Sequence, residues 1–201
     1  MVLSLILCLI LVLLILLIFR LVSTEKSIKS KNVESLKSGD LVLVKYDNLL
    51  GKAVKLWSGS NWTHIGIIYI DPDTNQTYVL EAANYNDKSL PKGIIQIPLK
   101  TWQNLNQHYT IKYISNSKII DSYQLKDIFD TYIGYKLYKV DSIFKWKRLF
   151  FPTQIQTKEL TCTEFVASVF KQLNLLPNDI HISEYSAYDL MTIYGKSEIQ
   201  I

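Results

Sequence analysis

Cysteine is scarce in this chain of 201 residues, which contains only Cys8 and Cys162. Two cysteines cannot form a disulfide framework, so the chain is not one of the small secreted domains that disulfides hold together. Cys8 lies within a long apolar run, where it cannot meet Cys162. We therefore expect Cys162 to be a free thiol, which suits a reducing compartment.

Clustered positive charge is also lacking. The formal net charge is only +4, and the lysines are scattered along the chain with no basic block. Proteins that bind nucleic acid usually carry a concentrated basic patch or stripe. We therefore expect no nucleic-acid partner.

Metal-binding motifs are absent, since the sequence contains neither a paired CxxC nor an HExxH pattern. These spacings are typical of zinc sites. A zinc site built from separate His, Glu and Cys residues remains a lesser alternative. We expect no metal and no cofactor.

An uncharged apolar run from Val2 to Phe19 stands at the start of the chain. A helix of about 20 apolar residues crosses about 30 Å of hydrocarbon, and Arg20 can extend to the head groups. Residues 1–22 are therefore predicted to be a transmembrane anchor, 23–35 a polar tether and 36–201 one domain. A cleaved signal peptide is the alternative, but a basic start and a small-residue cleavage site are lacking.

Positive charge follows the apolar run, at Arg20 and at four lysines of the tether and its end. The positive-inside rule then predicts a single-pass membrane protein with its C-terminal domain in the cytoplasm. Two glycosylation sequons, at Asn61 and Asn75, would instead place the domain outside the cytoplasm. Such triplets arise often by chance in an Asn-rich chain, so we give them little weight.

The segment Leu160 to Phe170 has the pattern of a helix with a cysteine in its first turn. Thr161 and Glu164 have the spacing of a capping box, which places Cys162 at the first helical position. Free N–H groups and the helix dipole favour a thiolate there. The alternative is that Cys162 is a small buried apolar residue, as most free cysteines are.

Two strands, His64–Ile70 and Thr77–Ala83, flank a segment rich in turn-forming residues. If Ile70 pairs with Thr77, His64 and Glu81 lie on one face of the hairpin as diagonal neighbours. Gly66 leaves room between them. The pattern therefore predicts a His–Glu hydrogen bond, which a slip of one residue would abolish.

The remaining pattern indicates an α+β fold, with an antiparallel sheet packed against the cysteine helix. Other strands are expected at 41–46, 93–97 and 109–114, and helices at 49–57, from Asp121 or Ser122 to 132, and in the tail at 186–191. His108 and His181 lie in polar surroundings and are expected at the surface. Five aromatic residues are candidates for a substrate cleft, although core and rim packing is the alternative for each: Trp57, Trp62, Tyr85, Tyr135 and Trp146.

A cysteine nucleophile needs a base, and the base needs an orienting partner. Lowering a thiol pKa from about 8.5 to about 6.5 takes about 2.7 kcal/mol. A helix N-terminus supplies only about 0.3–1 kcal/mol. Cys162 is therefore an effective nucleophile only if His64 lies beside it, with Glu81 fixing the tautomer of the imidazole.

Four motifs occur in the order found in circularly permuted papain-like thiol hydrolases of the NlpC-type superfamily, in which the histidine strand precedes the cysteine helix. From Leu36 to Ile193 the chain resembles the YiiX-like amidases, the thiol protease family of poxvirus virions and, more distantly, lecithin–retinol acyltransferase-like enzymes. The tail segment Tyr188-Asp189-Leu190 is also similar to the end of that domain. The motifs are Gly39-Asp40-Leu41-Val42-Leu43-Val44, Thr63-His64-Ile65-Gly66-Ile67-Ile68, Val79-Leu80-Glu81-Ala82 and Thr161-Cys162-Thr163-Glu164-Phe165-Val166.

The resemblance implies a permuted papain-like fold with Cys162 as nucleophile, His64 as base and Glu81 as the third polar residue. The predicted protein is a membrane-anchored cysteine hydrolase, amidase- or peptidase-like, that cleaves a peptide or amide substrate through an acyl-enzyme. A lipid acyl hydrolase or acyltransferase, acting on a lipid ester with the same three residues, is the second hypothesis. A catalytically silent scaffold on a membrane or virion surface is the third.

Overall fold

The computed structural model describes residues 32–47, 60–85, 89–137 and 158–195, together with Gly51, Lys52, Lys55 and Asp87. The predicted anchor, most of the tether and most of the predicted helix 49–57 lie outside this part of the chain. Among the helices that the structure describes, none has both the length and the apolar character needed to span a bilayer.

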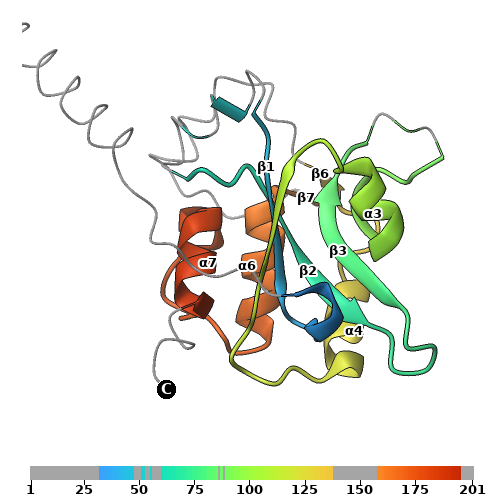
Figure 1. Ribbon diagram of the computed structural model, residues 1–201. Coiled ribbons are helices and arrows are strands. Elements are labelled where there is room, and N and C mark those ends of the chain that lie inside the picture. The colour runs from blue at the N-terminus through green and yellow to red at the C-terminus, as the bar shows by residue number, and fades with distance from the viewer. Residues whose placement is uncertain are drawn as a thin grey trace, which may run out of the picture.

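A five-stranded antiparallel sheet forms the centre of the domain (Figure 1). The strands follow the spatial order β4-β3-β2-β1-β5, so the first strand of the domain lies beside the last strand of this sheet. Their bounds are β1 Leu41–Lys45, β2 His64–Ile70, β3 Thr77–Ala83, β4 Gly93–Pro98 and β5 Thr110–Ile114. The predicted antiparallel sheet is therefore confirmed.

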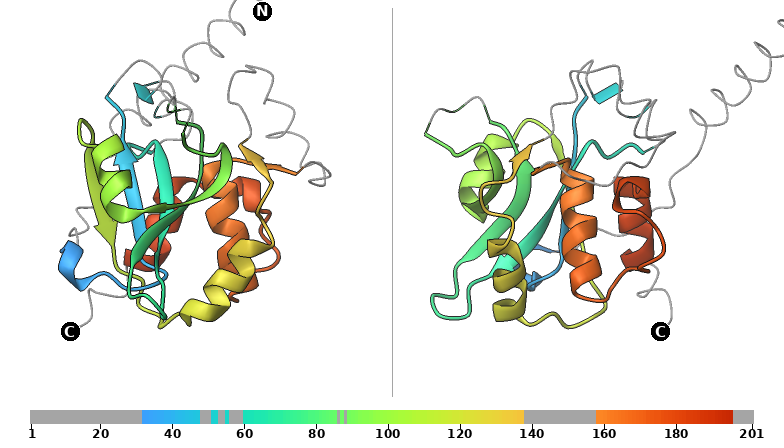
Figure 2. Two further views of the ribbon diagram at one scale, coloured as in Figure 1. Left: turned by 90° about the vertical axis from the view of Figure 1, so that its right-hand side faces the viewer. Right: turned by 180° about the vertical axis from the view of Figure 1, so that it is seen from behind.

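Helices cover both faces of this sheet, with α6 and α7 on one side and the short helix α3 on the other (Figure 2). The α-helices are α3 Leu99–Leu105, α4 Ser122–Asp130, α6 Cys162–Gln172 and α7 Ala187–Gly195, and two short 3₁₀ helices are η1 Val33–Ser35 and η3 Ile182–Glu184. The sequence pattern predicts α4, α6 and the start of α7, whereas helix α3 was not expected.

Two apolar cores lie on the opposite faces of the sheet, because strand side chains alternate between faces. The larger core joins Leu41, Leu43, Ile65 and Ile67 to α4, α6 and α7. The smaller core joins the alternate strand residues to α3, and contains Val42, Val44, Ile68, Val79, Ile97, Leu99, Trp102 and Tyr113. Each strand of the sheet centre is therefore apolar on both sides.

The hairpin of β2 and β3 has the predicted register. Ile70 pairs with Thr77, and the ladder continues to Ile67 opposite Leu80. The turn is closed by a hydrogen bond from the backbone N–H of Asp71 to the carbonyl of Gln76, and Asn75 adopts a φ of 55°. Asn tolerates this left-handed conformation better than most residues.

A second, two-stranded parallel sheet leads directly into the cysteine helix. It pairs β6 Lys136–Leu137 with β7 Glu159–Leu160. The backbone N–H of Ile94 donates to the carbonyl of Tyr135 at 3.1 Å, which attaches this small sheet to the start of β4. The position at which α6 begins is thus tied to the edge of the main sheet.

Candidate active site

Helix α6 begins with the predicted capping box. The Thr161 hydroxyl accepts from the backbone N–H of Glu164 at 3.2 Å, and the Glu164 carboxylate accepts from the backbone N–H of Thr161 at 2.8 Å. Cys162 is therefore the first helical residue. Its thiol is half-buried and forms no disulfide. The helix is held in place by Phe165, Val166, Val169 and Phe170, which are buried in the larger core.

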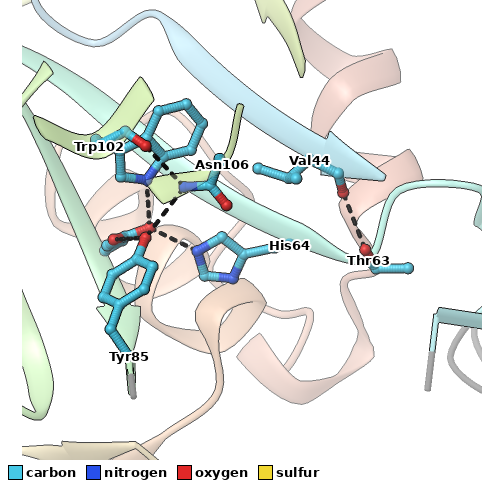
Figure 3. Close-up of polar contacts among 7 residues, drawn as sticks. Val44, Thr63, His64, Tyr85, Trp102 and Asn106 are labelled. Atoms are coloured by element: carbon cyan, nitrogen blue, oxygen red, sulfur yellow. Dashed lines mark hydrogen bonds and ion pairs between the residues drawn. The ribbon is translucent and has the colours of Figure 1, made fainter. Parts of the chain in front are cut away.

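Thr63 fixes the point at which β2 begins. Its backbone N–H donates to the carbonyl of Val44 at 2.9 Å, and its hydroxyl donates to the same carbonyl and accepts from the backbone N–H of Tyr46. The next residue, His64, pairs with Val44 across the ladder. His64 therefore lies on the face that carries the smaller core, and its ring lies close to the end of the sheet (Figure 3).

His64 and Glu81 form the predicted hydrogen bond. The distance between His64 Nε2 and Glu81 Oε2 is 2.6 Å, and the Glu81 side chain is fully buried. A methyl group at Gly66 would lie 3.4 Å from Cβ of Glu81 and 2.8 Å from Cγ1 of Val79. A side chain at this position would therefore overlap Val79, whereas its contact with Glu81 would be an ordinary one.

The thiol of Cys162 lies beside the imidazole of His64, within hydrogen-bonding reach. Because Nε2 of His64 contacts Glu81, Nδ1 is the nitrogen left for the sulfur. Burial alone would raise the pKa of Cys162, but the hydrogen bond and charge of His64, with the backbone N–H groups of Ile65 and Thr163, bring that pKa below its usual value. The structure thus brings all three predicted residues together.

The pKa of His64 moves in the opposite direction. Burial favours the neutral ring, but the neighbouring Tyr46, the charge of Glu81 and the hydrogen bonds with Cys162 and Glu81 raise its pKa well above the ordinary value. A lowered thiol pKa beside a raised imidazole pKa favours an ion pair of thiolate and imidazolium. This ion pair is the reactive form of a cysteine nucleophile.

An aromatic pair flanks the imidazole. The ring of Tyr46 is stacked on His64 with centroids 6.4 Å apart, and Tyr109 contacts Tyr46 edge to face at 4.5 Å. Tyr109 is partly exposed. The imidazole is therefore held between an aromatic ring and the carboxylate of Glu81.

Two further residues bind Glu81: Trp102, which the sequence did not single out, and Tyr85, which was expected only as a candidate for a substrate cleft (Figure 3). The indole Nε1 of Trp102 donates to Oε2 at 2.9 Å, and the hydroxyl of Tyr85 donates to Oε1 at 2.6 Å. Asn106 Nδ2 contacts the Tyr85 hydroxyl at 3.4 Å. The spacing of Leu99, Trp102 and Leu105 after Pro98 is the signal that predicts helix α3, but it does not indicate that Trp102 reaches Glu81.

The other singled-out side chains have different positions. Trp62 is part of the larger core, and Tyr135 packs against it. Among the aromatic candidates that the structure describes, Tyr85 is hydrogen-bonded to a predicted site residue, Glu81. Trp57 and Trp146 lie outside the described residues. His108 is exposed, as predicted, whereas His181 is half-buried and caps η3 through a hydrogen bond with Ser183.

The described part of the chain contains no cluster of three or more His, Cys, Asp and Glu side chains suited to hold a metal ion. The alternative of a zinc site thus gains no support from the described residues. The arrangement of Cys162, His64 and Glu81 instead has the donor and acceptor order that nucleophilic catalysis by cysteine requires.

Comparisons with known proteins agree with the fold. A family model described as the permuted papain-like amidase enzymes of the YaeF/YiiX, C92 family matches residues 35–191. A crystal structure described as the metalloprotein YiiX from Escherichia coli O157:H7 is similar in fold, with 18% identity and a TM-score of 0.50. That match covers 68% of this chain and 65% of the YiiX chain, slightly under two thirds. No curated protein sequence matches the chain. Neither comparison bears on the resemblance to poxvirus proteins, which stays a prediction.

Proposed function

Because the chain belongs to the permuted papain-like amidase family, we propose that it is a cysteine hydrolase that cleaves an amide bond through an acyl-enzyme on Cys162. His64 is the proposed base and Glu81 its orienting partner. Three observations carry this proposal: Glu81 contacts Nε2 of His64 at 2.6 Å, the imidazole lies beside the Cys162 thiol and lowers its pKa, and Cys162 is the first residue of helix α6.

The first half of the proposed reaction forms a thioester. The Cys162 thiolate attacks the carbonyl carbon of the substrate, and the electron pair of the C=O bond moves to oxygen. Backbone N–H groups in the first turn of α6 are donors suited to that oxyanion. When the C–N bond breaks, the imidazolium of His64 gives its proton to the departing amine, and the acyl group remains on sulfur.

The second half consumes water. Neutral His64 takes a proton from a water molecule, whose oxygen attacks the thioester carbon. The C–S bond then breaks, the carboxylic acid leaves, and the sulfur regains its place beside the imidazolium. Glu81 keeps its hydrogen bond to Nε2 throughout, so Nδ1 faces the reacting atoms in both halves. Such acid–base catalysis contributes about 10²–10⁴-fold to rate.

The test is to trap the acyl group. The purified full chain in detergent is mixed with a p-nitrophenyl acyl ester and with the matching p-nitroanilide, and the peptides are analysed by mass spectrometry. We expect the acyl mass on the peptide that contains Cys162 and none on the peptide that contains Cys8. Cys162→Ala should abolish turnover of both compounds. Turnover that persists in Cys162→Ala would disprove the mechanism.

A lipid ester substrate is the second candidate, and the apolar run from Val2 to Val22 favours it, because an anchored site lies close to lipid. Release of fatty acid from phosphatidylcholine vesicles separates this candidate from the first. A protein that releases neither amine nor fatty acid, and whose Cys162 titrates like a free thiol, would instead be the catalytically silent scaffold.

Membrane attachment through residues 1–22, with the domain in the cytoplasm, is part of the same proposal. The uncharged run and the lysines that follow it support this arrangement. The full chain should stay in the membrane pellet after an alkaline wash, and deletion of residues 1–22 should release it. Release of the full chain by the same wash would exclude an integral anchor.

A further inference from the structure

The carboxylate of Glu81 accepts hydrogen bonds from three side chains, and only His64 among them belongs to the proposed triad. We infer that Trp102 and Tyr85 are positioning residues, which hold the Glu81 carboxylate in place and through it hold the His64 imidazole against Cys162. This inference rests on the proposed function and deepens it.

The two donors bind different oxygens. Trp102 Nε1 donates to Oε2, the oxygen that also contacts His64, whereas the Tyr85 hydroxyl donates to Oε1. A carboxylate held at one oxygen can still turn about its terminal bond. Held at both oxygens it cannot turn without breaking a hydrogen bond, and the Glu81 side chain is fully buried, where an unpaired polar group is costly.

The donors also fix the direction of the hydrogen bonds. An indole N–H can only donate, so Trp102 requires an acceptor at Oε2. Tyr85 keeps its proton, because burial, followed by the charge of Glu81 and its hydrogen bond, raises its pKa far above the ordinary value. Glu81 is therefore the acceptor in all three contacts, so His64 carries its hydrogen on Nε2. The lone pair on Nδ1 is then free to take the proton of Cys162.

Both donors are supported by helix α3. Trp102 is fully buried in the smaller core, where it packs with Ile68, Val79 and Ile97. Asn106 caps the C-terminal end of α3, and its Nδ2 donates to the Trp102 carbonyl at 3.0 Å and contacts the Tyr85 hydroxyl at 3.4 Å. A site held by a rigid element keeps its geometry better than one held by a loop.

Two substitutions remove one donor each. Tyr85→Phe deletes a single oxygen at a half-buried position, and Trp102→Phe deletes the indole N–H while keeping an aromatic ring in the core. Leu99→Val is the matched control, because Leu99 lies on the same helix and in the same core and makes no described contact with Glu81. Glu81→Ala is the reference for complete loss of the carboxylate.

The first measurement is the rate of Cys162 alkylation by iodoacetamide as a function of pH, in a Cys8→Ser background so that one thiol is observed. A loosened imidazole lowers the pKa of the sulfur less, so the midpoint should move to higher pH in both donor variants. At pH 6 we expect alkylation to slow by about 10-fold, the low end of the loss that follows when a hydrogen-bond partner of a metal-bound histidine is removed. Leu99→Val should keep the parent profile.

The second measurement is turnover of the p-nitrophenyl ester. We expect kcat to fall by about 10-fold, with KM nearly unchanged, in Tyr85→Phe and in Trp102→Phe. In the Glu81→Ala background neither substitution should lower kcat further, because the group that it positions is gone. A loss in that background equal to the loss in the parent would overturn the inference.

The outcomes separate this inference from the function itself. If Glu81→Ala moves the alkylation midpoint but Tyr85→Phe and Trp102→Phe do not, the triad stands and the positioning role is wrong. If Glu81→Ala leaves the midpoint where it is in the parent, the proposed role of Glu81 fails. If Trp102→Phe lowers the melting temperature more than Leu99→Val does, its effect on the site includes a loss of folding stability. The alkylation midpoint and kcat of Tyr85→Phe then test the positioning role.

Discussion

Two titratable groups with opposite pKa shifts meet in the site. Burial opposes ionisation of Cys162, but His64 outweighs that effect and lowers the thiol pKa. Burial also opposes protonation of His64, but Tyr46, Glu81 and the sulfur outweigh it and raise the imidazole pKa. The thiolate forms as the pH rises through the lowered pKa, and the imidazolium is lost as the pH rises through the raised one. Both shifts therefore favour the pair of thiolate and imidazolium over the pair of neutral groups.

The first prediction follows from the lowered pKa of the Cys162 thiol. In the Cys8→Ser protein, the alkylation rate of Cys162 should reach half its maximum at a pH below about 8.5, the ordinary pKa of a free thiol. His64→Ala removes both the hydrogen bond and the positive charge, so the midpoint should move up to or beyond that value. An unchanged midpoint in His64→Ala would show that the helix start, not the imidazole, activates the sulfur.

Among single residues, the sequence identifies Cys162, His64 and Glu81, because their local sequence surroundings are distinctive. Cys162 stands out by its capping box, and Glu81 by its place in an apolar strand. Trp102 does not stand out, and Tyr85 stands out only as a candidate for a substrate cleft, because their contacts with Glu81 depend on how α3 packs on the sheet. A tryptophan at helical spacing is indistinguishable in sequence from one that only fills a core.

Among the elements, the start of α6 carries the nucleophile, and its two capping hydrogen bonds hold the first turn. The second prediction is that Thr161→Ala lowers the free energy of unfolding by about 1 kcal/mol, the usual cost of losing a cap. Thr161→Ser keeps the hydroxyl and should retain most of that stability. Urea unfolding followed by circular dichroism measures both. Equal stability of the Ala and Ser variants would contradict the role of the cap.

The hairpin and the short helix differ in how far sequence determines them. The β2–β3 register follows from a turn rich in Asp, Pro and Asn between two strands, and Ile70 pairs with Thr77 as predicted. Helix α3 has only seven residues, and apart from the cap its support comes from packing of Leu99 and Trp102 on strands β3 and β4. Short helices are marginal without tertiary contacts, so their sequence signal is weak.

For the whole molecule, the main sheet and the cysteine helix are joined through Gly93. This residue has a φ of +108°, and a methyl group there would overlap the carbonyl oxygen of Tyr135. That carbonyl accepts from Ile94 and leads into β6, which pairs with β7 just before Cys162. The contact between β4 and Tyr135 joins segments that are distant in sequence. It therefore cannot be predicted from a local sequence pattern.

The third prediction compares two glycines with positive φ. Gly134 has a φ of +87° and no atom within 4 Å of the added methyl, so Gly134→Ala should cost about 1–2 kcal/mol from backbone strain alone. Gly93→Ala adds the overlap with Tyr135 and should cost about 1–3 kcal/mol more. Thermal unfolding measures the stability of both variants. Alkylation of Cys162 at pH 6 should slow in Gly93→Ala only, and equal effects of the two substitutions would refute the proposed link.

The pairing of β6 with β7 has an evolutionary consequence. Leu137 and Leu160 are partners in the ladder, although 22 residues separate them along the chain. The two ends of the intervening stretch are therefore held together by the β6–β7 ladder, directly before Cys162. Because the ladder fixes both ends, insertions and deletions between them are expected to leave the position of Cys162 unchanged, and this is where length differences among related proteins should be tolerated.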